Sequence, residues 1–217
     1  MAESPKIAYV FPGQGSQKVG MGKSLCSRYP SAQKVFEEAD TALGFSLSQL
    51  CFQGPEEELI KTINVQPAIL VTSIACLRAT REASDNNLPT PYFVAGHSLG
   101  EYTALVAANV IRSSDAAILV RERGRLMYEA GLKNPGSMLA IIGLDEKIVE
   151  NICLESKTEI SNINCPGQIV ISGATDALAE ASKLARAKGA RIISLKVSGA
   201  FHSALMEPIT AEFNKVL

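Results

Sequence analysis

The segment Tyr92–Leu105, YFVAGHSLGEYTAL, constrains the fold more than any other part of this sequence. Apolar residues that favour a buried strand lead into a Gly-x-Ser-x-Gly turn at 96–100, and small, apolar residues typical of a helix follow. Gly96 and Gly100 lack side chains, so the backbone can turn sharply and the helix can pack close to the strand. The sequence therefore predicts a strand–turn–helix with Ser98 at its apex.

Strand and helix patterns alternate along the first part of the chain, which predicts a layered α/β core. Ser31 is a candidate cap for one of these helices, and Pro67 suits the first turn of another. We predict strands at 6–11 and 91–95, and helices at 31–43, 66–82, 98–111 and 113–131.

The second part of the chain has the order β-α-β-β-α-β, which is typical of a ferredoxin-like unit. Asp145 is a candidate cap for its first helix, and Cys165-Pro166-Gly167 predicts a tight turn between its two middle strands. We place an inserted small subdomain at 134–197 and a large subdomain at 1–133 and 198–217. The predicted strands are 136–144, 159–164, 168–173 and 190–197, and the predicted helices are 145–156 and 175–189.

Ser98 is a candidate nucleophile because it sits at the N-terminus of the predicted helix. Free N–H groups and the helix dipole at that position stabilise an oxyanion formed by attack on a carbonyl, and the N–H of Leu99 is the natural first donor. A simpler interpretation makes Ser98 a helix cap beside a glycine turn. The strand–turn–helix context favours the nucleophile.

Arg123 falls on the apolar face of the helix predicted at 113–131. The apolar residues of that helix lie three, four or seven positions from it, which is the spacing of one helical face. A buried guanidinium keeps its charge and requires a partner, and its planar fork matches a carboxylate. Arg123 therefore pairs either with an internal acid or with the carboxylate of a substrate, unless it reaches solvent.

The sequence contains only two histidines, His97 and His202, as candidate bases for Ser98. His97 adjoins the serine, and adjacent side chains at such a turn leave the backbone in different directions. Serine–histidine pairs form in space rather than in sequence. His202, in the loop AFHS, is therefore a candidate partner for Ser98, although a lone histidine by default has a purely structural role.

The glycine-rich loop FPGQGSQ at 11–17 does not match a nucleotide-binding pattern. Lys18 stands where Gly-x-Gly-x-x-Gly requires glycine, and Gln17 stands where a Walker A motif requires it. We predict instead that this loop brings a backbone N–H, for example that of Gln14, to the site beside Ser98 as a second oxyanion donor.

Composition gives no reason to expect a nucleic-acid or membrane partner. Lysine and arginine number 21 against 22 acidic residues, and the five scattered cysteines form no Cys-x-x-Cys pair typical of a metal site. The start of the chain lacks a signal-peptide pattern, and its apolar runs are shorter than the ~20 residues that span a bilayer. We expect a soluble, cytoplasmic protein without a metal.

Six motifs together give the sequence a close resemblance to a known family. It resembles the malonyl-CoA:acyl-carrier-protein transacylases and the related acyltransferase domains of polyketide synthases. The resemblance runs from about residue 6 to the end. The motifs, in order, are FPGQGSQ, QPAIL, GHSLGEYTAL, RGRLM, NCPGQIVISG and AFHSALM.

The resemblance implies an α/β-hydrolase-like large subdomain with an inserted ferredoxin-like small subdomain. It implies transfer of a malonyl group from coenzyme A to the phosphopantetheine thiol of an acyl carrier protein in fatty acid biosynthesis, without a cofactor bound by the chain itself. The implied residues are the nucleophile Ser98, the base His202, the oxyanion donors Gln14 and Leu99, and the substrate-binding residues Arg123, Gln66, Asn164 and Phe201.

The resemblance suggests that bulky Phe201 crowds an α-methyl branch and so favours malonyl over methylmalonyl groups. Members of the family continue past Leu217, and the group that orients the catalytic histidine is expected there. Three alternatives stay open: an acyltransferase of a polyketide synthase system, a serine hydrolase with the same turn, and an inactive fragment that only binds carrier protein.

Overall fold

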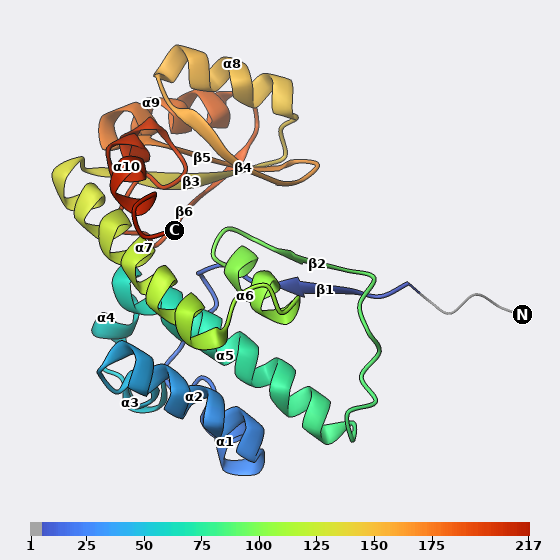
Figure 1. The fold of residues 1–217 in the computed structure, drawn as a ribbon. Coiled ribbons are helices and arrows are strands. Elements are labelled where there is room, and N and C mark those ends of the chain that lie inside the picture. The colour runs from blue at the N-terminus through green and yellow to red at the C-terminus, as the bar shows by residue number, and fades with distance from the viewer. Residues whose placement is uncertain (1–5) are drawn as a thin grey trace, which may run out of the picture. The chain divides into compact units, whose positions relative to one another are not determined.

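The computed structural model describes residues 6–217, and the chain divides after Gly124 into two compact units. Residues 1–5, the start of the predicted large subdomain, lie outside the described residues. The first unit contains β1 (Ala8–Phe11), α1 (Lys23–Arg28), α2 (Pro30–Leu43), α3 (Leu47–Gln53), α4 (Glu56–Leu59), α5 (Thr62–Ala83), β2 (Phe93–Gly96), α6 (Gly100–Ala107) and the first half of α7 (Ser113–Lys133) (Figure 1).

The central helix of the first unit is α5, which contacts α2, α3 and α6. Residues on most of its circumference are buried, including Val65, Leu70 and Ile74. By length and composition alone, α5 is long and apolar enough to cross a membrane. However, 67% of its most apolar window is buried inside the structure, as in the core helix of a globular unit. The apolar side chains of α5 therefore form part of the hydrophobic core of the first unit.

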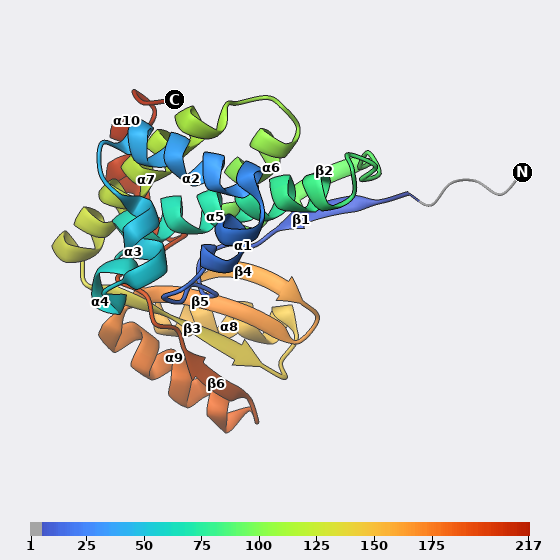
Figure 2. The same ribbon diagram turned by 90° about the horizontal axis from the view of Figure 1, so that it is seen from below.

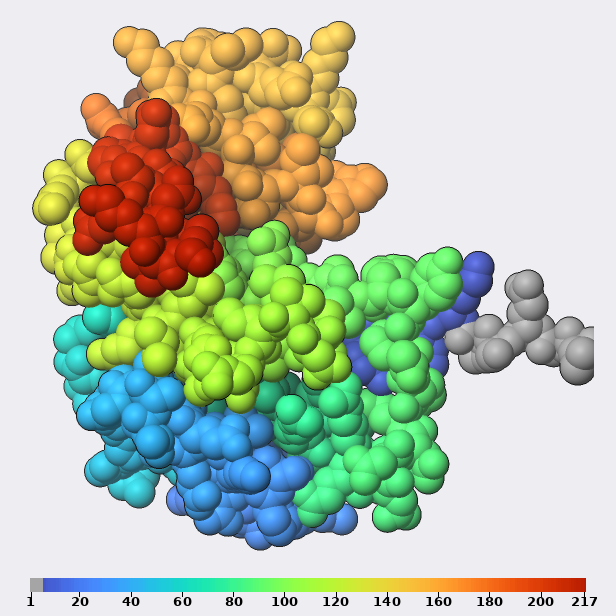
Figure 3. Space-filling view, viewed as in Figure 1, coloured from blue at the N-terminus to red at the C-terminus, as the bar shows by residue number. Residues whose placement is uncertain are grey.

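Strands β1 and β2 pair in parallel, with Ala8 opposite Phe93 and Phe11 opposite Gly96. Helix α6 packs beside both strands (Figure 1). Val10 is 74% exposed and Phe93 57% exposed, and the dark-blue N-terminal strand is visible at the surface in Figure 3. Parallel strands are normally covered on both faces, so this small sheet presents apolar side chains that a further element would bury.

The second unit follows the predicted β-α-β-β-α-β order. Its four strands form an antiparallel sheet in the order β4-β5-β3-β6, and α8 and α9 lie together on one face of that sheet (Figures 1 and 2). Asp145 caps α8 as predicted, because its carboxylate accepts the N–H of Ile148 at 3.0 Å. The elements are β3 (Gly136–Ile142), α8 (Glu146–Ser156), β4 (Glu159–Cys165), β5 (Gln168–Ala174), α9 (Thr175–Ala187), β6 (Arg191–Ser194), the 3₁₀ helix η1 (Ala204–Ile209) and α10 (Thr210–Phe213).

A second apolar cluster joins the end of α7 to the C-terminal residues. Met127 of α7, Met138 of β3, and Phe201 and Met206 from the C-terminal segment belong to it. This packing explains why residues 125–133 and 198–217 group with the second unit, whereas the sequence prediction assigned both to the large subdomain. The predicted subdomain boundaries remain a hypothesis.

Several predicted helix ends were wrong. Helix α5 begins at Thr62, so Pro67 lies inside the helix rather than in its first turn. Pro30 occupies the first turn of α2 and Tyr29 precedes it, so Ser31 is not the cap. The sequence patterns also missed short helices, namely α1, α3, α4 and η1. Helices this short have too few turns for a hydrophobic periodicity to be recognised in the sequence.

A close approach between helices at Gly124 gives a direct test of the fold. A Cβ added there would lie 2.5 Å from the Thr62 carbonyl oxygen at the start of α5. Glycine-to-alanine changes inside helices usually stabilise by about 1 kcal/mol, but here we expect Gly124→Ala to destabilise by about 1–3 kcal/mol. Urea unfolding measures the change. Arg78→Ala, at an exposed position of α5, is the control and should shift stability by less than about 0.5 kcal/mol.

Candidate active site

Ser98 occupies a strained turn between β2 and α6. Its φ is 51°, in the left-handed region that residues with a Cβ rarely adopt. The turn is held by the N–H of Gly100, which donates to the His97 carbonyl at 2.8 Å, and by the N–H of Glu101, which donates to the Ser98 carbonyl at 3.2 Å. Strain of this kind is typical of a nucleophile elbow.

Two glycines make the turn sterically possible. A Cβ at Gly96 would overlap the backbone of Gly100, and a Cβ at Gly100 would overlap the carbonyl oxygen of Phe11 at the end of β1. The N–H of His97 donates to that same Phe11 oxygen at 3.0 Å. The structure thus explains the Gly-x-Ser-x-Gly spacing by backbone contact between β1, β2 and α6.

The glycine-rich loop after β1 lies against the turn. A Cβ at Gly13 would be 2.8 Å from the His97 carbonyl oxygen and 2.9 Å from His97 Nδ1. The backbone N–H groups of Gln14 and Leu99 form no hydrogen bonds with residues 6–217. Leu99 follows Ser98 directly, and Gln14 follows the glycine that lies against His97, so both N–H groups belong to the segments where the sequence predicted oxyanion donors.

Arg123 points from α7 toward the serine. Its Nη1 donates to Gln66 Oε1 at 2.9 Å, and its Nη2 donates to Ser98 Oγ at 3.2 Å. Its guanidinium carbon lies 5.7 Å from the centre of the Tyr102 ring. Gln66 is fully buried. The first unit thus brings together Ser98, Arg123 and Gln66, and adds Tyr102, which the sequence reasoning missed.

Tyr102 has a sequence signal in hindsight, because it follows Ser98 by four positions. Tyr102 lies in the first turn of α6, which directly follows the turn that carries Ser98, so the chain places the two residues near each other. Burial raises the pKa of its hydroxyl, whereas the charge of Arg123 lowers it and that of Glu101 raises it. Its ring supplies the apolar wall beside the guanidinium.

Burial lowers the pKa of Arg123, and the charges of Tyr102 and Glu101 act in the opposite direction. Arginine stays protonated even so, which leaves a positive charge in a largely desolvated position. Among residues 6–217 the hydrogen-bond partners of its guanidinium are the neutral Gln66 and Ser98. A guanidinium has five N–H donors, so donors remain for an anion.

The neighbouring arginines of α7 have other partners. Arg121 Nη1 donates to Asn64 Oδ1 at 2.9 Å and stacks 4.1 Å from the centre of the Phe45 ring. Arg125 forms an ion pair with Glu129 at 2.8 Å. Arg123 is therefore distinct among the three in being directed at the serine.

The remaining predicted site residues lie in the second unit, and each is described there. His202 is exposed and has a φ of 58°, so its backbone is also strained. Phe201 is only 3% exposed and packs in the apolar cluster of that unit. Asn164 is exposed near the end of β4. No group of three metal-ligating side chains occurs among the described residues.

Comparison with known proteins identifies the family. Residues 8–217 match the model of the acyl transferase domain. The malonyl CoA-acyl carrier protein transacylase of Bacillus subtilis is 48% identical over 218 residues, which cover 98% of this chain and 68% of the relative. The chain therefore spans about two thirds of the length of that relative.

Solved structures give the same result. An acyl-carrier-protein S-malonyltransferase from Bartonella henselae is 45% identical, with a TM-score of 0.91 over 98% of this chain and 69% of that one. A malonyl-transacylase solved in complex with a type II PKS acyl-carrier protein is 42% identical, with a TM-score of 0.92 over 98% and 69%. The chain has an α/β fold that matches these structures, and it belongs to the acyl transferase domain family.

Proposed function

We propose that this chain transfers a malonyl group from coenzyme A to the phosphopantetheine thiol of an acyl carrier protein, in fatty acid biosynthesis. The observation that carries the proposal is the hydrogen bond from Arg123 to Ser98 Oγ at 3.2 Å. In a malonyl ester of Ser98 one methylene separates the ester carbonyl from the free carboxylate. Arg123 is therefore placed to bind that carboxylate while Ser98 carries the acyl group.

The first half-reaction forms the malonyl-serine ester. His202 takes the Ser98 proton as Oγ attacks the thioester carbonyl, and the backbone N–H groups of Leu99 and Gln14 stabilise the oxyanion. The carbon–sulfur bond breaks, and the departing coenzyme A sulfur takes the proton from His202. Arg123 holds the carboxylate of the ester, and Gln66 holds Arg123 in place.

The second half-reaction reverses these steps with a different thiol. His202 removes the proton from the phosphopantetheine thiol, and the sulfur attacks the ester carbonyl. The same two N–H groups stabilise the second oxyanion. Ser98 Oγ then leaves and recovers its proton from His202. Because the donor leaves before the acceptor binds, the kinetics are ping-pong.

Each of the two units, taken by itself, has a fold that agrees with the proposal. The first unit, with its elbow between β2 and α6, fits an α/β-hydrolase-like large subdomain, and the β-α-β-β-α-β order of the second fits an inserted ferredoxin-like subdomain. We further propose that Asn164 contacts the substrate from the second unit and that the bulk of Phe201 disfavours an α-methyl branch. We also propose that no cofactor is bound and that the protein acts in the cytoplasm.

A serine hydrolase is the second candidate, because the elbow alone serves both activities. The position of Arg123 favours acyl transfer. A hydrolase of simple esters gains nothing from an arginine that only a carboxylate-bearing acyl group can satisfy, and such a charge disfavours neutral acyl groups.

Covalent labelling tests the nucleophile. Incubation of the purified protein with malonyl-CoA should give one malonyl adduct, which peptide mass spectrometry locates on Ser98. Ser98→Ala should give none, whereas Ser27→Ala, which removes an exposed hydroxyl, should label fully. Addition of a carrier-protein thiol should discharge the adduct faster than water does. A protein that never forms the adduct, or forms it elsewhere, contradicts the proposed reaction.

Selectivity tests Arg123. We expect Arg123→Ala to lower the ratio of kcat/KM for malonyl-CoA to that for acetyl-CoA by at least about 30-fold, because a hydrogen bond to a charged group contributes about 2–3 kcal/mol. Arg112→Ala, which removes an exposed guanidinium that pairs with Asp115, should leave the ratio unchanged. An unchanged ratio in the Arg123 variant would contradict the role of this residue.

A further inference from the structure

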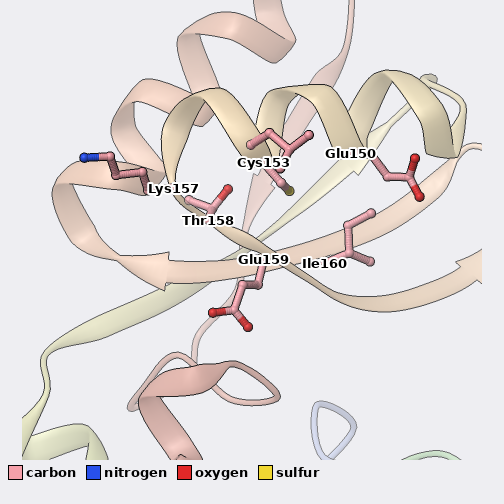
Figure 4. A pocket seen from close by; sticks show the side chains of 7 residues that line it. Glu150, Cys153, Lys157, Thr158, Glu159 and Ile160 are labelled. Carbon is pink, nitrogen blue, oxygen red and sulfur yellow. The ribbon is translucent and has the colours of Figure 1, made fainter.

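A side chain from β4 holds the loop that carries His202. Both carboxylate oxygens of Glu159 accept the backbone N–H of Ala204, at 3.2 and 3.1 Å. Ala204 follows His202 by two residues. Figure 4 shows the Glu159 carboxylate pointing away from α8, whereas Glu150, which lines the same hollow, projects from α8 itself.

Glu159 supplies a cap that the local sequence does not. Ala204 is the first residue of η1, and the first N–H groups of a helix have no partner within it. Ser203 precedes η1 and could act as its cap, but its hydroxyl donates to the Ala200 carbonyl at 2.6 Å instead. The carboxylate of Glu159 takes the position that a capping side chain would otherwise fill.

The backbone between these anchors is strained at one residue. His202 has a φ of 58°, and Ser203 returns to extended geometry. On one side Phe201 is 3% exposed in the apolar cluster, and on the other Glu159 binds Ala204. A non-glycine residue keeps a left-handed conformation only where its surroundings fix it, so the loop depends on both anchors.

We propose that Glu159 is a positioning residue for His202. It fixes the backbone of the loop through Ala204 and so holds the imidazole in the orientation that proton transfer requires. The role of His202 as the base rests on the proposed function. The claim that Glu159 fixes the backbone of the loop rests on the structure alone.

Three variants separate this role from a general effect of charge. Glu159→Ala removes the hydrogen bond to Ala204, Glu159→Gln keeps an oxygen that can accept the Ala204 N–H, and Glu150→Ala removes a carboxylate from the same hollow without touching the loop.

Two measurements are made on each variant. The first is hydrogen exchange at the Ala204 amide together with the imidazole NMR signals, which are simple because the chain has two histidines. The second is kcat and KM for malonyl transfer.

We expect Glu159→Ala to speed exchange at Ala204 about tenfold and to shift or split the His202 signal, with the His97 signal unchanged. We expect kcat to fall about tenfold with KM for malonyl-CoA unchanged. Glu159→Gln should stay within about threefold of the wild type in both readouts, and Glu150→Ala should match the wild type.

Unchanged exchange at Ala204 in Glu159→Ala would overturn the proposal, as would a Glu159→Gln variant as impaired as Glu159→Ala. If the wild type transfers no malonyl group, the proposed function fails. The exchange and NMR readouts would still decide whether Glu159 holds the loop.

Discussion

The site depends on one partly buried positive charge, that of Arg123. The guanidinium of Arg123 is largely desolvated, and among the described residues its hydrogen bonds go to the amide oxygen of Gln66 and the hydroxyl of Ser98. Neutral partners orient a cation but do not balance its charge. In the function proposed above, an acyl group that ends in a carboxylate supplies the missing charge beside Ser98, and one contact then serves both substrate selection and catalysis.

Close backbone contacts place this charge beside the serine. Gly96 and Gly100 allow β1, β2 and α6 to meet at the turn, and Gly124 allows α7 to lie against the start of α5. A side chain at any of these positions would push the elements apart. A displacement of α7 would move Arg123 away from Ser98, and the cost of such misplacement in an active site is large.

The sequence predicted much of this arrangement, because its strongest signals are local. The elbow at Ser98 and the position of Arg123 on an apolar helical face follow from spacing alone, and so does the order of elements in the second unit. Tyr102 and Glu159 did not emerge from the sequence. Each makes a contact that forms only in the folded chain, Tyr102 with a guanidinium from another helix and Glu159 with a backbone N–H 45 residues away. The start of α5 was misplaced because Pro67 is a common first-turn residue, and packing of the whole helix overrode that preference.

The most direct test of the account compares acylation by malonyl-CoA with acylation by its neutral isostere, in which an amide replaces the free carboxylate. Rapid-quench measurement of the acyl-serine adduct gives the rate of the first step for each. The two acyl groups have the same size, so only the charge presented to Arg123 differs. The account predicts that the amide reacts at least about 30-fold more slowly, and that Arg123→Ala removes the difference. Equal rates in the wild-type protein would contradict it.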